Sequence, residues 1–133
     1  MFVRYHIAKA ERIEATLKKL DVVQDYEMII ECCMLAGSHY MNAALHAAKI
    51  SHPMQDQAHT FRPPLEFLRK EVGPEILRGA KPLEYIEGTR EDHVRGGAPY
   101  DRALVERCLK CLQEAREAFL AVVGPARNKA VWE

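Results

Sequence analysis

The sequence predicts an all-α fold, an antiparallel bundle of four to five helices. Apolar residues recur with the 3.6-residue period of amphipathic helices, while no segment of useful length shows the alternation of a strand. No internal repeat of a solenoid type is visible. Because 133 residues is close to the commonest domain size, we predict one helical-bundle domain over residues 1–133, with residues 124–133 as a C-terminal tail.

Two helices are expected in the first half of the chain. The first covers Glu11–Leu20, where Ile13, Leu17 and Leu20 recur at helical spacing between charged residues. The second is a long central helix over about 24–50, which contains no proline and is interrupted only by Gly37.

The central helix should be covered on most of its sides. On a helical wheel its polar side chains gather on one narrow strip, made of Glu27, Glu31, Ser38, Asn42 and Lys49. The remaining surface is largely apolar, so we expect this helix to be either the centre of the bundle or half of a dimer interface.

The second half of the chain reads as shorter pieces followed by one long helix. Pro53 ends the central helix, a short helix is expected over Leu65–Val72, Gly73-Pro74 interrupts it, and a further helix begins near Pro82. The last helix is predicted over about 100–123, with Pro99 near its first turn and Gly124-Pro125 as its stop. Its buried stripe is expected to contain Leu104, Cys108, Cys111, Ala115 and Phe119.

Charge and hydropathy exclude several classes of protein. Lys plus Arg equals Asp plus Glu at 19 each, so no net positive field draws the chain to RNA or to an anionic membrane, and an RNA role would need a local basic patch. No apolar stretch is long enough for a membrane span, and the N-terminus does not have the pattern of a signal peptide. We therefore expect a cytoplasmic protein without membrane attachment.

The four cysteines are expected to be reduced thiols in the core. Cys32 and Cys33 are adjacent in the central helix, and Cys108 and Cys111 belong to the apolar face of the last helix. None of them has the setting of a catalytic nucleophile, and no Gly-x-Ser-x-Gly motif or glycine-rich phosphate loop occurs. We expect no cofactor.

The histidines of the central helix form a candidate ligand-binding face. His39 and His46 share one helix face about 10 Å apart, which is too far for one metal ion and suits histidines hydrogen-bonded to a neighbouring helix. Neither Glu-x-x-His nor His-Glu-x-x-His is present, so no metal site is expected. His52 and His59 continue the spacing, and a histidine-rich metal-binding bundle therefore stays as an alternative.

The densest polar cluster covers residues 87–95. There Arg90 and Arg95 flank His93, so the two guanidinium groups could hold a phosphate while the imidazole acts as a general base. The other interpretation is a solvated helix end.

Two segments resemble the HEPN superfamily of small helical-bundle proteins. Residues 36–48, AGSHYMNAALHAA, are similar to its aromatic-Ala-x-x-His-Ala-Ala helix, and residues 87–119 are similar to its polar turn and closing helix. The resemblance implies a bundle that dimerises through its long helices, often encoded beside a nucleotidyltransferase-like partner, with some toxin members acting as ribonucleases. Those nucleases carry Arg followed after four to six residues by His, whereas only two residues separate Arg90 from His93.

Together these features predict a non-catalytic, HEPN-like homodimer that binds a protein partner or a small nucleotide-like ligand. The expected ligand groove contains His39, Tyr40, Asn42 and His46, close to His93. The alternative is a HEPN-type ribonuclease of the toxin and antitoxin class, in which His93, Arg90 and Arg95 are catalytic.

Overall fold

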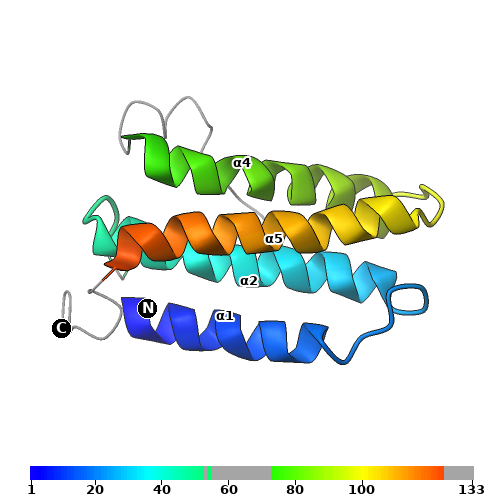
Figure 1. Cartoon of the computed structure of the whole chain (residues 1–133), viewed down its shortest axis with the longest axis horizontal. Coiled ribbons are helices and arrows are strands. Elements are labelled where there is room, and N and C mark those ends of the chain that lie inside the picture. The colour runs from blue at the N-terminus through cyan, green and yellow to red at the C-terminus, as the bar shows by residue number, and fades with distance from the viewer. Residues whose placement is uncertain (53, 55–72, 125–133) are drawn as a thin grey trace.

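The computed structural model describes residues 1–52, 54 and 73–124, which form a helical bundle without strands. The helices are α1 (Val3–Leu17), α2 (Tyr26–Ala47), α4 (Gly73–Arg90) and α5 (Arg102–Val123), and a π-helical turn, η1 (Glu91–Arg95), follows α4 directly. Successive helices run antiparallel, with α1 and α4 on opposite sides of the α2–α5 pair (Figure 1). The predicted fold class is confirmed. None of the described helices is long and apolar enough to cross a membrane.

Helix α2 is the centre of the bundle. Every residue from 36 to 46 is buried, and α1, α4 and α5 all pack against this helix. Small residues permit the close packing: a Cβ at Gly37 would lie 2.2 Å from Cδ2 of Leu83 on α4. The apolar surface that suggested a dimer interface is therefore covered within the chain, so it gives no reason to require a second copy.

The predicted polar strip of α2 is wrong at its middle positions. Ser38 and Asn42 are buried rather than solvated. Ser38 Oγ donates to the Met34 carbonyl at 2.6 Å, and Asn42 Nδ2 donates to the Ser38 carbonyl at 3.1 Å. These hydrogen bonds to backbone carbonyls one helical turn earlier offset the cost of burying the two polar side chains. A pattern of polar and apolar residues does not show such bonds.

Helix ends differ from the prediction for local reasons. The predicted start of the first helix at Glu11 is wrong, because α1 begins at Val3 and its buried face starts with Val3, His6 and Ile7. Helix α2 stops three residues before the predicted end: Lys49 has a φ of 60°, and the Ile50 N–H bonds the Leu45 carbonyl at 2.9 Å.

In the second half of the chain, Pro82 and Pro99 do not mark the helix starts that were predicted from them. The predicted start of a further helix near Pro82 is wrong, because α4 begins at Gly73 and runs continuously with Pro82 inside it. The interior proline costs about 3 kcal/mol, and burial of the stripe Ile76, Leu83 and Ile86 offsets that cost. Pro99 lies before α5 rather than in its first turn, and Asp101 caps that helix by accepting from the Ala103 N–H at 3.0 Å. The helix expected over Leu65–Val72 lies outside the described residues.

Candidate functional site

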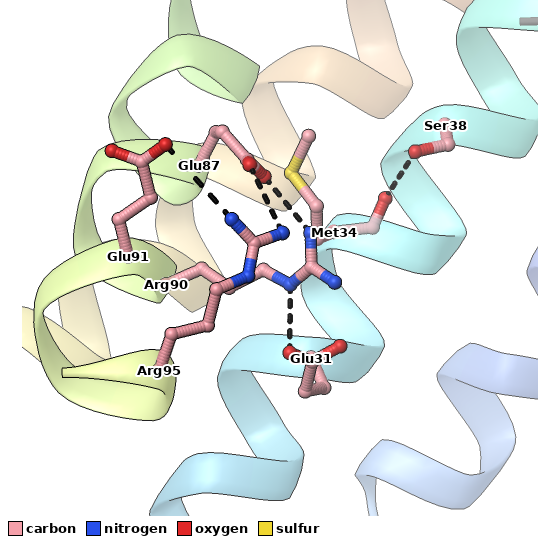
Figure 2. A network of polar contacts seen from close by, with 7 residues as sticks. All are labelled: Glu31, Met34, Ser38, Glu87, Arg90, Glu91 and Arg95. Carbon is pink, nitrogen blue, oxygen red and sulfur yellow. Dashed lines mark hydrogen bonds and ion pairs between the residues drawn. The ribbon is translucent and has the colours of Figure 1, made fainter. Parts of the chain in front are cut away.

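Arg90, at the end of α4, is held by two carboxylates. Its Nε donates to Glu31 of α2 at 2.7 Å, and its Nη1 donates to Glu87 at 3.2 Å (Figure 2). The side chain is only 11% exposed. Although burial alone would lower the pKa of Arg90, the hydrogen bonds to Glu31 and Glu87 raise it above its ordinary value. The charged Arg90 guanidinium therefore connects α4 to α2 through its ion pair with Glu31.

Arg95 extends the same network. Its guanidinium lies 3.6 Å from Glu87 and 3.9 Å from Glu91, so both arginines of the predicted catalytic cluster face carboxylates of this chain (Figure 2). We name the group of Glu31, Glu87, Arg90, Glu91 and Arg95 the carboxylate clamp.

His93 lies in the π-helical turn η1 and lines a groove that includes no residue of the carboxylate clamp. Such turns are rare and frequently occur at functional sites. The turn ends at Gly96, where a Cβ would come within 2.7 Å of the Asp92 carbonyl, so glycine permits this close return of the backbone. His93 is half-buried and lines a groove between the α4–η1 segment and α5.

This groove, which we call the η1 groove, has a volume of about 280 Å³. It is lined by Glu84, Tyr85, Gly88, Thr89, Asp92, His93 and Leu104. The Tyr85 hydroxyl oxygen is buried and has no hydrogen-bond partner in the described part of the chain. Buried hydroxyls without a partner are uncommon, and the Tyr100 hydroxyl is a second one in the described residues, outside this groove.

The η1 groove is acidic. Glu84 and Asp92 are both exposed, and neither forms an ion pair with another described residue. The nearby Arg107 guanidinium lies over the Tyr85 ring at 4.4 Å from its centroid, a cation–π position.

A hollow of about 330 Å³ between α1 and α5 is lined by Glu14, Leu17, Lys18, Leu109, Leu112, Gln113 and Arg116. Two others that are also larger than the η1 groove lie on the α5 surface, and none of the three includes a residue of the predicted sites. One, of about 480 Å³, is lined by Glu106, Arg107, Lys110, Cys111 and Glu114. The other, of about 460 Å³, is lined by Arg78, Glu114, Glu117 and Ala118. Their charged side chains are those of an ordinary solvated helix face, and neither contains a histidine or an orphaned polar atom. We therefore place the candidate site in the η1 groove.

The histidines of α2 lie in the core, not in a surface groove. His39 and His46 are 4% and 0% exposed, and both face α1, where His6 is 1% exposed. Nδ1 of His6 and Nδ1 of His39 are 2.9 Å apart, so one ring donates and the other accepts. The predicted hydrogen bond to a neighbouring helix is confirmed for His39, with deeper burial than expected.

The other predicted ligand residues, Tyr40 and Asn42, are also buried. The Tyr40 hydroxyl accepts from Arg116 Nε of α5 at 3.3 Å, and burial raises the pKa of Tyr40 to about 12. Asn42 is buried with its amide on the Ser38 carbonyl.

The structure does not bring His93 together with His39 and His46. Arg90 anchors the η1 end of α4 beside Glu31, and His46 lies 15 positions further along α2 than Glu31, roughly 22 Å away along the helix axis. His52 is exposed, and His59 lies outside the described residues.

The sequence analysis did not identify three residues that take part in these contacts or line the groove: His6, Tyr85 and Glu31. His6 could have been found, since it continues the spacing of Val3, Ile7 and Ala10 on one helix face. Nothing local distinguishes Glu31 or Tyr85, because their importance comes from partners far along the chain.

All four cysteines are buried and unbridged, as predicted. Burial raises the pKa of Cys108 to about 11 and that of Cys33 well above its ordinary value. These thiols are unsuited to nucleophilic catalysis. Within residues 1–52, 54 and 73–124, no group of three or more His, Cys, Asp or Glu side chains is arranged to hold a metal ion.

Comparison of the chain with models of protein families, with curated proteins and with solved structures finds no match.

Proposed function

We propose that this chain is a non-catalytic, HEPN-like helical-bundle module that binds a basic group of a protein partner in the η1 groove. The observation that carries the proposal is the neutralisation of Arg90 and Arg95 by the carboxylate clamp. With both guanidinium groups engaged, the charged side chains that line the groove are Glu84 and Asp92, and the Arg107 guanidinium lies beside it over the Tyr85 ring.

Charge complementarity favours a cationic group over a phosphate. A phosphate in the η1 groove would face two carboxylates, whereas a lysine or arginine side chain would gain an ion pair with them. The groove volume of about 280 Å³ suits a single side chain better than a nucleotide. Of the two ligand classes expected from the sequence, these features support the protein partner.

The ribonuclease alternative needs a cation free to hold phosphate beside His93. In the carboxylate clamp, releasing Arg90 would leave Glu31 without this partner and Glu87 with Arg95 alone, at a cost that a weakly bound phosphate does not offset. This argument favours a binding role for His93 over a catalytic one.

The proposal is tested by titrating ¹⁵N-labelled protein with N-acetyl-arginine amide, N-acetyl-lysine amide and adenosine monophosphate. The two basic probes should shift the amide signals of Gly88, His93 and Leu104, with a dissociation constant on the order of 1 mM for so small a ligand. The shifts should weaken with salt, because both carboxylates are exposed.

Gly88 offers a matched pair of variants. A Cβ at this position meets nothing within 4 Å, so Gly88→Ala should bind the basic probes normally, while Gly88→Leu should fill the groove and abolish their shifts. Shifts by adenosine monophosphate alone, or cleavage of RNA that is lost in His93→Ala, would reject the proposal in favour of the ribonuclease.

A further inference from the structure

The hollow between α1 and α5, which we call the α1–α5 hollow, combines apolar and charged side chains. Both helices pack on α2 (Figure 1). Its volume of about 330 Å³ is at the lower end of the range for small-molecule sites. Three leucines line it together with a carboxylate, an amide and two cations, and it shares no residue with the η1 groove.

The leucines give the α1–α5 hollow an apolar wall. Leu17 and Leu112 belong to the hydrophobic core and are 9% and 4% exposed, and Leu109 is partly buried against that core. The two hollows on the α5 surface contain no leucine. A ligand with an apolar body would therefore remove part of its surface from water in the α1–α5 hollow.

Arg116 is held through one nitrogen, which leaves the other end of its guanidinium for a ligand. Its Nε donates to the Tyr40 hydroxyl at 3.3 Å and lies 3.6 Å from a Glu14 carboxylate oxygen. Because Tyr40 is fully buried on α2, these contacts fix the position of the guanidinium. Neither Nη nitrogen has a hydrogen-bond or ion-pair partner among the residues that the structure describes. A carboxylate can accept two parallel N–H groups from such an end.

The charges that line the α1–α5 hollow favour an anion. Lys18 is exposed and has no ion pair within the described part of the chain, so two cations accompany the single carboxylate of Glu14. That carboxylate already lies opposite Arg116. Glu11 helps to keep Arg116 charged by raising its pKa, but it does not line the hollow. One bound carboxylate would balance the remaining cation.

We propose that the α1–α5 hollow binds a small organic acid, a carboxylate with an apolar body. The carboxylate would lie between Lys18 and the Nη end of Arg116, and the apolar body would pack on the three leucines. A body of about ten carbon atoms suits a hollow of this volume. This inference does not rest on the proposed function.

The test is a titration of ¹⁵N-labelled protein with 4-phenylbutyrate, followed by amide chemical shifts. The acid should shift the signals of Lys18, Leu109 and Gln113, with a dissociation constant on the order of 1 mM. Two probes with the same apolar body separate charge from apolar contact. The neutral 4-phenyl-1-butanol should bind about fivefold more weakly, and 4-phenylbutylamine should cause no shifts, because its cation faces Lys18 and Arg116.

Matched variants test the individual contacts. Lys18→Gln should weaken binding of the acid about fivefold, whereas Lys19→Gln should bind like the wild type, because Lys19 is exposed and does not line the hollow. Glu14→Gln should strengthen binding about twofold by removing the like charge. Gln113 is exposed, so Gln113→Trp should fold normally, fill the hollow and abolish the shifts.

Three outcomes would overturn this inference. They are the absence of shifts by 4-phenylbutyrate in the wild type, equal binding of the acid, the alcohol and the amine, and equal affinities in Lys18→Gln and Lys19→Gln. Loss of basic-probe binding at the η1 groove would leave these results unaffected, so the two proposals fail separately.

Discussion

Replacing Arg90 by methionine tests whether the carboxylate clamp holds the bundle together. The substitution keeps an apolar stem and removes the cation, which leaves Glu31 without this partner and Glu87 with Arg95 alone, at side-chain exposures of 26% and 17%. Removing one partner of a fully buried ion pair costs about 3–5 kcal/mol, whereas an exposed pair contributes at most about 1 kcal/mol. Because these carboxylates are partly exposed, we expect a loss of about 2 kcal/mol.

Urea denaturation followed by circular dichroism measures this loss. At a typical slope for a domain of this size, the midpoint should fall by about 1 M urea with the slope unchanged. Arg102→Met is the matched control, because Arg102 pairs with Glu106 at 2.9 Å but both side chains are more than half exposed. That control should unfold at the wild-type midpoint.

The double variant Arg90→Met with Glu31→Gln separates a clamp from simple loss of packing. Removing the orphaned charge should restore part of the stability, so the double variant should lose less than the sum of the two single changes. A midpoint for Arg90→Met equal to that of the Arg102 control, or strictly additive losses, would refute the clamp. It would also return Arg90 to the set of side chains available to a ligand.

Three further outcomes are expected. Gly79→Ala should destabilise α4 by about 1–3 kcal/mol by overpacking, since its Cβ would come within 2.6 Å of the buried Phe119 ring. Gly88→Ala on the same helix should instead stabilise it by about 0.5–1 kcal/mol. The thermal unfolding midpoints of the two variants should therefore shift in opposite directions, and equal shifts would contradict the packing argument. Burial raises the pKa of Cys108 to about 11 from an ordinary value of 9.0, so its thiolate fraction at pH 8 should be about 100-fold lower than that of an exposed thiol, and a disulfide reagent should label it slowly until the chain unfolds. The free energy of unfolding should decline as pH rises from about 9 to 11, because the folded state holds the proton that the unfolded state loses. Rapid labelling of the native protein would count against this burial. Tyr40→Phe should cost about 1 kcal/mol through loss of its hydrogen bond and leave probe binding at the η1 groove unchanged, because its hydroxyl is bonded to α5; weakened probe binding would restore Tyr40 as a ligand residue.

The sequence by itself determined those features that depend on residues close together in the chain. The all-α class, the long helices α2 and α5 and the buried thiols followed from periodicity, because the spacing of apolar residues decides which face of a helix can be buried. The polar cluster around His93 was also visible, since its members lie within nine consecutive positions.

The tertiary structure decided which distant residues meet and where local preference is overruled. Pro82 stays inside α4 because burial of that helix's apolar stripe outweighs a local cost. Arg90 is paired with Glu31 across 59 positions, and His6 meets His39 across 33. Such pairs are fixed only when whole helices dock, so no window of sequence contains both partners. In this protein, that docking pairs Arg90 and Arg95, the arginines of the alternative ribonuclease interpretation, with carboxylates, and it buries His39 and His46, which were expected in a ligand groove.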